Sequence, residues 1–186
     1  CGRHCRLCCN RYSKIMANTI PISDLSMFVD FDEVMFTGGE PLFLPGEKLV
    51  EIAIQLKKIG VKKLFLYTTF WNKNGDTLFP YLDGVHFSIH DDYKPRDLET
   101  LKVIQSLAEK NRSKSFRLYI DPAVELPVIV DARFWRRIEC KPFMNEEELF
   151  ALQKDGVPID ENLFVYLPTA KSANAPEIPV VIEEAI

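Results

Sequence analysis

Strand-like and helix-like segments alternate through the middle of this chain, and this alternation constrains its fold more than any other feature. Apolar residues at helical spacing predict a helix after Pro45, ending at Gly60, and a second helix after Pro95. Strands that alternate with helices form parallel sheets, so we expect an α/β fold in which at least four strands share a direction. The predicted strands are Glu33–Thr37, Lys63–Thr69, Gly84–His90, Phe116–Asp121 and Phe134–Cys140. Only 12 residues separate Asp121 from Phe134, so no full crossover helix is expected between the last two strands.

The predicted strands have one apolar and one polar face, because successive side chains point to opposite sides of a strand. A parallel strand covered by helices on both sides is apolar on both faces. We therefore expect helices on one face and a polar lumen or cleft on the other, with a half-solvated antiparallel sheet as the alternative. The polar faces carry His86, Ser88 and His90, then Arg117, Tyr119 and Asp121, and then Trp135, Arg137 and Glu139.

Charge and hydropathy narrow the class of protein. The chain has 23 Lys and Arg against 27 Asp and Glu, a net charge of −4, which argues against nucleic acid as a partner. No apolar run approaches the ~18 residues of a membrane span, so no membrane partner is expected. Four of the five cysteines lie in the first nine residues. Such clustering is typical of metal binding in a reducing cytoplasm, which is the predicted location.

The cysteines Cys1, Cys5 and Cys8 have the spacing C-x3-C-x2-C. Thiolates are the ligands of iron–sulfur clusters, and three of them leave one iron of a four-iron cluster without a protein ligand. Structural zinc is the alternative, but it needs a fourth ligand, here Cys9 or His4. The side chains of adjacent residues such as Cys8 and Cys9 point apart, so we expect Cys9 not to be a ligand.

A second motif, Thr37-Gly38-Gly39-Glu40-Pro41, stands at the end of a predicted strand. Two glycines let the backbone approach a ligand closely, and Pro41 biases Glu40 toward an extended conformation. The carboxyl ends of strands are where α/β folds place ligands, and a carboxylate there suits an ammonium group. A simple turn between strand and helix is the alternative.

Together these motifs resemble the radical S-adenosylmethionine superfamily, whose signature is C-x3-C-x-Φ-C, with Leu7 at the Φ position, followed by Gly-Gly-Glu-Pro after the second strand. The resemblance covers roughly Cys1 to Cys140 and implies a partial (β/α)6 TIM-like barrel with mostly parallel strands. Cys1, Cys5 and Cys8 would hold a [4Fe–4S] cluster whose open iron binds S-adenosylmethionine. Reductive cleavage of this cofactor would give a 5′-deoxyadenosyl radical that takes hydrogen from a substrate. The cofactor-binding residues implied are Gly38, Gly39, Glu40, Ser88, His90 and Arg117.

The resemblance also implies an electron donor such as flavodoxin or ferredoxin. It names no catalytic side chain and no substrate, which would be a protein, a peptide or a small molecule. Residues 1–143 would form the core, and residues 144–186 a helix followed by a loosely ordered tail with a possible edge strand at Ile178–Ile182. The family's first strand precedes the cysteines, so we expect a segment before Cys1 to be missing. A zinc-binding interaction domain and an inactive fragment of the superfamily are the alternatives.

Overall fold

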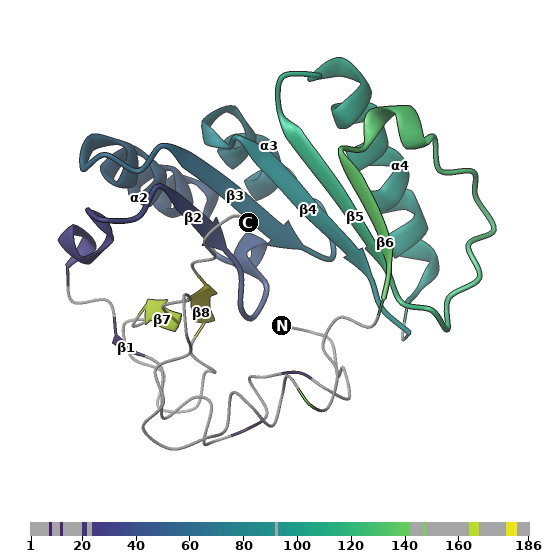
Figure 1. The fold of residues 1–186 in the computed structure, drawn as a ribbon, viewed down its shortest axis with the longest axis horizontal. Coiled ribbons are helices and arrows are strands. Elements are labelled where there is room, and N and C mark those ends of the chain that lie inside the picture. Colours follow the sequence, from purple (N-terminus) through teal and green to yellow (C-terminus); the bar gives the residue numbers. More distant parts are fainter. Residues whose placement is uncertain are drawn as a thin grey trace.

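The structure is a computed structural model. It describes residues 24–91 and 93–141, together with Cys8, Tyr12, Ile20–Pro21, Glu147, Phe164–Leu167 and Ile178–Val181. Across these residues runs one sheet of eight strands in the order β1-β7-β8-β2-β3-β4-β5-β6 (Figure 1).

Five neighbouring strands of this sheet follow one another in chain order and are all parallel. The predicted α/β class and the common direction of the strands are therefore confirmed, and an antiparallel arrangement is excluded for this part of the sheet. The carboxyl ends of β2 to β5 open on one side, as expected. The strands are β2 (Glu33–Phe36), β3 (Lys63–Thr68), β4 (Gly84–Ile89), β5 (Ser115–Ile120) and β6 (Arg137–Cys140).

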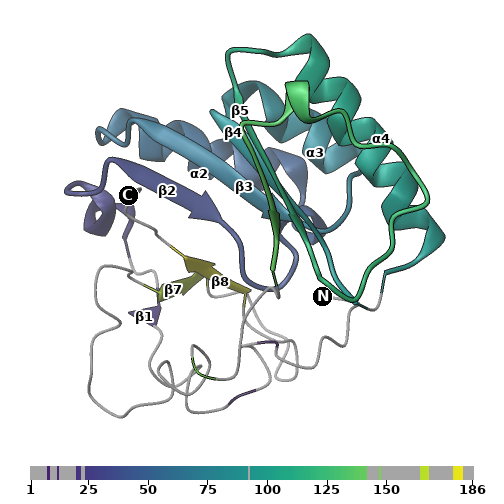
Figure 2. The ribbon, with the colours of Figure 1, turned by 45° about the vertical axis from the view of Figure 1, so that its right-hand side comes forward.

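The helices α2 (Gly46–Lys58), α3 (Lys73–Leu78) and α4 (Pro95–Lys110) lie on the same face of the sheet (Figures 1 and 2). Apolar residues of the strands and helices pack together there in one core. None of the helices in the described ranges is long and apolar enough to cross a membrane. The core includes Val34, Phe36, Leu64, Leu66, Val85, Phe87, Phe116 and Leu118 from the strands, and Leu49, Ala53, Leu56, Leu101, Ile104 and Ala108 from the helices.

Helix α3 begins in a stretch rich in residues that are typical of turns, from Asn72 to Asp76. The Asn72 side chain caps the helix by accepting hydrogen bonds from the backbone N–H groups of Asn74, at 2.9 Å, and Gly75, at 3.2 Å. A Cβ at Gly75 would lie 2.9 Å from the Trp71 ring, so this glycine permits close packing rather than a turn. Asn72 thus serves as the cap of this short helix, and Gly75 provides its close contact with Trp71.

The link between β5 and β6 contains the short 3-10 helix η5 (Ala132–Phe134), and no crossover α-helix is present in it, as the short spacing predicted. Strand β6 begins at Arg137, and Trp135 lies on the helix side of the sheet. The indole Nε1 donates a hydrogen bond to Gln105 Oε1 of α4 at 3.4 Å. The prediction that Trp135 shares a polar face with Arg137 and Glu139 was therefore wrong.

At the other end of the sheet, β8 (Ile178–Val181) pairs with β2 in the antiparallel direction, with Met35 opposite Val181. Strand β7 (Phe164–Leu167) is antiparallel to β8, and β1 (Ile20–Pro21) is parallel to β7. The strand expected at residues 178–182 is thus present, but it lies inside the sheet rather than at its edge. The helix expected at the start of residues 144–186 lies outside the described residues, apart from Glu147. The remaining 3-10 helices of the described ranges are η2 (Leu25–Phe28), η3 (Pro41–Phe43) and η4 (Phe79–Tyr81).

Candidate functional site

The glycine motif lies where β2 ends, at the carboxyl edge of the parallel strands. Gly38 has a φ of 105°, in the left-handed region that a side chain makes costly, so the turn requires glycine at this position. After Gly39 the chain is extended at Glu40 and enters η3 at Pro41. The sequence-predicted residues Gly38, Gly39 and Glu40 therefore stand at the edge where ligands bind in α/β folds.

The carboxylate of Glu40 is buried, with 2% of the residue exposed, and it joins the ends of β2 and β3. The Thr68 hydroxyl donates to Oε1 at 2.7 Å, and the Leu42 N–H donates to the same oxygen at 3.4 Å. Oε2 accepts from the Thr69 N–H at 3.0 Å and from the Thr69 hydroxyl at 3.1 Å. Burial raises the pKa of Glu40, and these hydrogen bonds oppose the rise.

The position of Thr68 shows which way this carboxylate points. Thr68 shares a face of β3 with Leu64 and Leu66, which pack against the helices. Oε1 of Glu40 is therefore bound on the helix side of the sheet, and the carboxylate holds the glycine turn against β3. Contact between Glu40 and the ammonium of a bound cofactor stays a prediction.

The face of the sheet opposite the helices is polar and aromatic, as its sequence indicated. Tyr67, His86 and Arg117 are register partners across β3, β4 and β5, so they form one row. Tyr119 lies in the next row and stacks on Tyr67, with ring centroids 5.9 Å apart and planes inclined by 24°. The His86 ring lies 5.3 Å from the Phe65 ring. These rings and polar groups line one surface that leads toward the carboxyl edge.

His86 is buried, with 3% exposed, and its Nε2 has no hydrogen-bond partner among the residues that the structure describes. Burial, and secondly the neighbouring Arg117 cation, lower the pKa of His86 to about 3, so the imidazole is neutral at pH 7. The Nε of Arg117 also lacks a partner within the described ranges. Two polar atoms of this row are thus left for a further group, because buried polar atoms are normally hydrogen bonded.

Ser88 and His90 come together at the carboxyl end of β4. The Ser88 hydroxyl and the His90 Nε2 are 2.9 Å apart, and both residues are buried. Thr68 pairs with Phe87, so Thr69 and Ser88 each lie one residue beyond this pair, at the same level of the sheet. The predicted residues Ser88 and His90 are therefore on the same edge as Glu40, whereas Arg117 lies one row deeper.

The proposed metal ligands cannot be placed together from the described residues. Cys1 and Cys5 lie outside them, and Cys8 is half-buried. Within the described ranges, no three His, Cys, Asp or Glu side chains form a group that could hold a metal ion. If the two motifs form one site, the cysteine segment should lie over the carboxyl edge of the sheet, and this stays a prediction because the segment, apart from Cys8, lies outside the described residues.

Comparison of the chain with protein-family models, with curated protein sequences and with solved structures found no match. The interpretation of the site therefore depends only on the residues of this chain. Sequence reasoning missed the part played by Thr68 and Thr69, which hold Glu40. The signal for it was a pair of hydroxyl side chains at the end of the strand next to β2.

Proposed function

We propose that this chain is a radical S-adenosylmethionine enzyme, with Cys1, Cys5 and Cys8 as the ligands of a [4Fe–4S] cluster. When bound, the cluster and S-adenosylmethionine supply reductive cleavage of the sulfonium and abstraction of hydrogen from a substrate. The electron would come from a donor such as flavodoxin or ferredoxin. The side chains on the polar face of the sheet would determine which class of substrate binds.

The observation that carries this proposal is the Gly38-Gly39-Glu40 turn at the carboxyl edge of a parallel sheet. Strands β2 to β6 are adjacent in chain order, and α2, α3 and α4 lie on one face only. A doubly wound sheet reverses its strand order and has helices on both faces, whereas a barrel does neither. This arrangement supports the partial (β/α)6 TIM-like barrel that we propose for residues 1–143.

The described residues fit the amino-acid part of S-adenosylmethionine. The positive φ of Gly38 and the missing Cβ atoms at Gly38 and Gly39 allow backbone carbonyls to approach an ammonium group. Glu40 keeps this turn in place through Thr68 and Thr69. The neutral imidazole of His86 and the guanidinium of Arg117 offer unpaired polar atoms on the face below the edge. They suit the polar groups of a nucleoside or an anionic substrate.

The test is anaerobic reconstitution with iron and sulfide, followed by reduction and addition of S-adenosylmethionine. We expect about four irons per chain, acid-labile sulfide and formation of 5′-deoxyadenosine. Cys1→Ala, Cys5→Ala and Cys8→Ala should each lose the cluster and the product. Cys9→Ala is the matched control and should retain both, because two adjacent residues such as Cys8 and Cys9 are poorly placed to bind the same cluster.

Three results would contradict the proposal. Stoichiometric zinc without sulfide would support a zinc-binding interaction domain instead. A complete cluster that cleaves no S-adenosylmethionine would support an inactive member of the superfamily. Full retention of the cluster in Cys5→Ala, or its loss only in Cys9→Ala, would refute the ligand assignment.

A further inference from the structure

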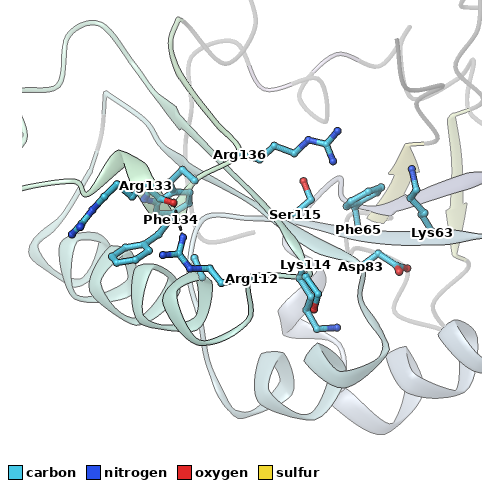
Figure 3. A pocket seen from close by; sticks show the side chains of 12 residues that line it. Lys63, Phe65, Asp83, Arg112, Lys114, Ser115, Arg133, Phe134 and Arg136 are labelled. Carbon is cyan, nitrogen blue, oxygen red and sulfur yellow. Dashed lines mark hydrogen bonds between the residues drawn. The ribbon is translucent and has the colours of Figure 1, made fainter.

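A pocket of about 390 Å³ lies at the amino-terminal edge of the sheet, opposite the edge that carries Gly38 and Glu40. It is formed where β3, β5 and β6 begin and where the chain leaves α4 (Figure 3). Cations outnumber anions in its lining although the chain as a whole has a net charge of −4. The charged lining residues are Lys63, Arg112, Lys114, Arg133 and Arg136, with Asp83.

Two of these cations are already neutralised by carboxylates. Lys63 Nζ lies 2.6 Å from Glu33 Oε1, and Arg133 Nη2 lies 2.5 Å from Asp131 Oδ2. Because an ion pair lowers the attraction for a further anion, the positive character of the pocket comes mainly from its other cations.

Arg112 is held in a fixed position at one wall of the pocket. Its Nη1 donates a hydrogen bond to the Arg133 carbonyl at 2.6 Å, and its guanidinium lies 4.3 Å from the centre of the Phe134 ring. A guanidinium fixed in this way loses little conformational entropy when it meets an anion.

Lys114 lies at the same edge and donates to the Leu82 carbonyl. Burial lowers the pKa of Lys114, the Asp83 carboxylate opposes this effect, and the Lys57 cation adds to it. A bound anion would stabilise the charged form of this amine, because opposite charges favour ionisation.

Arg136 and Ser115 lie on the opposite side of the strands from Arg112 and Lys114 (Figure 3). Arg136 is exposed, and its guanidinium has no ion pair or hydrogen bond with the described residues. The Ser115 hydroxyl is shielded from solvent and lacks a hydrogen-bond partner among the same residues. An unpaired buried hydroxyl is costly, and an oxyanion bound beside the exposed Arg136 guanidinium would give the Ser115 hydroxyl a partner.

We propose that this pocket binds a small molecule that carries a phosphate or diphosphate group. The guanidinium of Arg136 and the hydroxyl of Ser115 donate hydrogen bonds to phosphoryl oxygens, while Arg112 and Lys114, on the opposite side of the strands, add positive charge at longer range. Arginine is suited to this role because its planar fork matches phosphate geometry. The volume is within the ~300–1,000 Å³ of small-molecule sites. The acidic chain as a whole disfavours a long polyanion such as a nucleic acid.

The test is a calorimetric titration of the full chain with inorganic pyrophosphate, at two salt concentrations. Arg136→Gln should weaken binding by about 10- to 100-fold, because it removes charge-assisted hydrogen bonds. Ser115→Ala should weaken it by about tenfold for the same reason. Lys48→Gln, which removes one charge from the exposed face of α2, is the matched control and should leave affinity unchanged. Thermal unfolding of each variant checks that the fold is intact.

Several results would overturn the proposal. One is the absence of pyrophosphate binding at millimolar concentration. Another is an equal loss of pyrophosphate affinity in Arg136→Gln and Lys48→Gln, which would mean that the anion is attracted by the net charge of the protein and does not bind at a specific site. A third is tighter binding of a single-stranded oligonucleotide than of pyrophosphate, which would assign the pocket to nucleic acid. None of these results depends on the cluster, so they leave the proposed enzymatic function to its own test.

Discussion

Glu40 and His86 are both buried ionisable side chains, but their surroundings differ. Glu40 accepts four hydrogen bonds that support its charged form against burial. His86 has no partner for Nε2 within the described residues and lies beside a cation, so it gives up its proton instead. The first residue therefore fixes the backbone, whereas the second leaves a polar atom for a ligand.

Replacing Glu40 with Gln tests the role of its carboxylate. Each carboxylate oxygen accepts a hydrogen bond from a backbone N–H, that of Leu42 on Oε1 and that of Thr69 on Oε2, so the amide NH2 of Gln would face a donor in either orientation. We expect Glu40→Gln to lower the free energy of unfolding by about 1–3 kcal/mol, measured by denaturant titration. Glu47→Gln, at an exposed position of α2, is the control and should change it by less than about 0.5 kcal/mol.

The same variant tests cofactor binding. A charge-assisted hydrogen bond to the methionine ammonium predicts a loss of S-adenosylmethionine affinity of about 10- to 150-fold, with iron content unchanged. Unchanged affinity in Glu40→Gln would mean that the motif is only a turn. A loss of iron together with affinity would mean that Glu40 acts through the fold.

His86 predicts how stability depends on pH. Its folded-state pKa, about 3, is below the ordinary 6.5, so the unfolded chain binds a proton that the folded protein excludes. The free energy of unfolding should therefore decrease as pH falls from 6.5, by up to about 1.4 kcal/mol per pH unit. The His86→Gln side chain stays neutral, so this variant should take up about one proton fewer on unfolding below pH 6.5. The free energy of unfolding of the variant, measured at several pH values, should therefore change less steeply with pH. Parallel curves for the two proteins would show that His86 is not the titrating group.

At the scale of elements, the pattern of apolar residues predicted the strands and two of the helices because burial determines both. It missed α3, since Asn72 and Gly75 are turn residues in isolation and become a cap and a packing contact only against Trp71. It also placed Trp135 on the wrong face, because β6 begins two residues later, at Arg137. Local composition does not determine where such tertiary contacts begin.

The candidate site was predictable to a similar extent. Its edge follows from the strand pattern, so Gly38 and Ser88 could be assigned to one side of the sheet. The partners of Glu40 could not be predicted, because they depend on the register of β2 with β3, in which Phe36 lies opposite Leu66. The amino-edge pocket was missed as well, since its cations are distant in sequence and only meet where strands begin.

Gly84 tests the contact between β4 and β5. A Cβ at this position would lie 2.1 Å from the Ser115 carbonyl oxygen and 3.0 Å from the Phe65 ring, so the two strands would have to separate. We expect Gly84→Ala to lower the free energy of unfolding by about 3 kcal/mol or more. Gly60→Ala is the matched control, because Gly60 has a φ of 112° but nothing within 4 Å of the added Cβ. Only strain of about 1–2 kcal/mol is expected there, and equal effects would contradict the packing argument.

At the scale of the whole molecule, the parallel strands separate two different sites. The carboxyl edge carries the glycine turn and Glu40, and the amino edge carries the basic pocket. Strands β3, β4 and β5 have six residues each, which at ~3.3 Å per residue puts about 20 Å between the edges. The apolar core packs against the strands between them, and no described hydrogen bond joins the two sites.

This separation predicts that the two ligands stabilise the protein independently. A ligand at 100 times its dissociation constant adds about 2.7 kcal/mol to the free energy of unfolding. S-adenosylmethionine and pyrophosphate, added separately and together to the reconstituted protein, should give increments that sum to within about 0.5 kcal/mol, since sites more than ~10 Å apart are usually additive. Arg136→Gln should remove only the stabilisation by pyrophosphate, and Gly38→Ala should reduce mainly the stabilisation by S-adenosylmethionine. A joint increment that departs from the sum by more than about 1 kcal/mol would mean that the sheet couples its two edges, and that occupancy of the basic pocket regulates the proposed cofactor site.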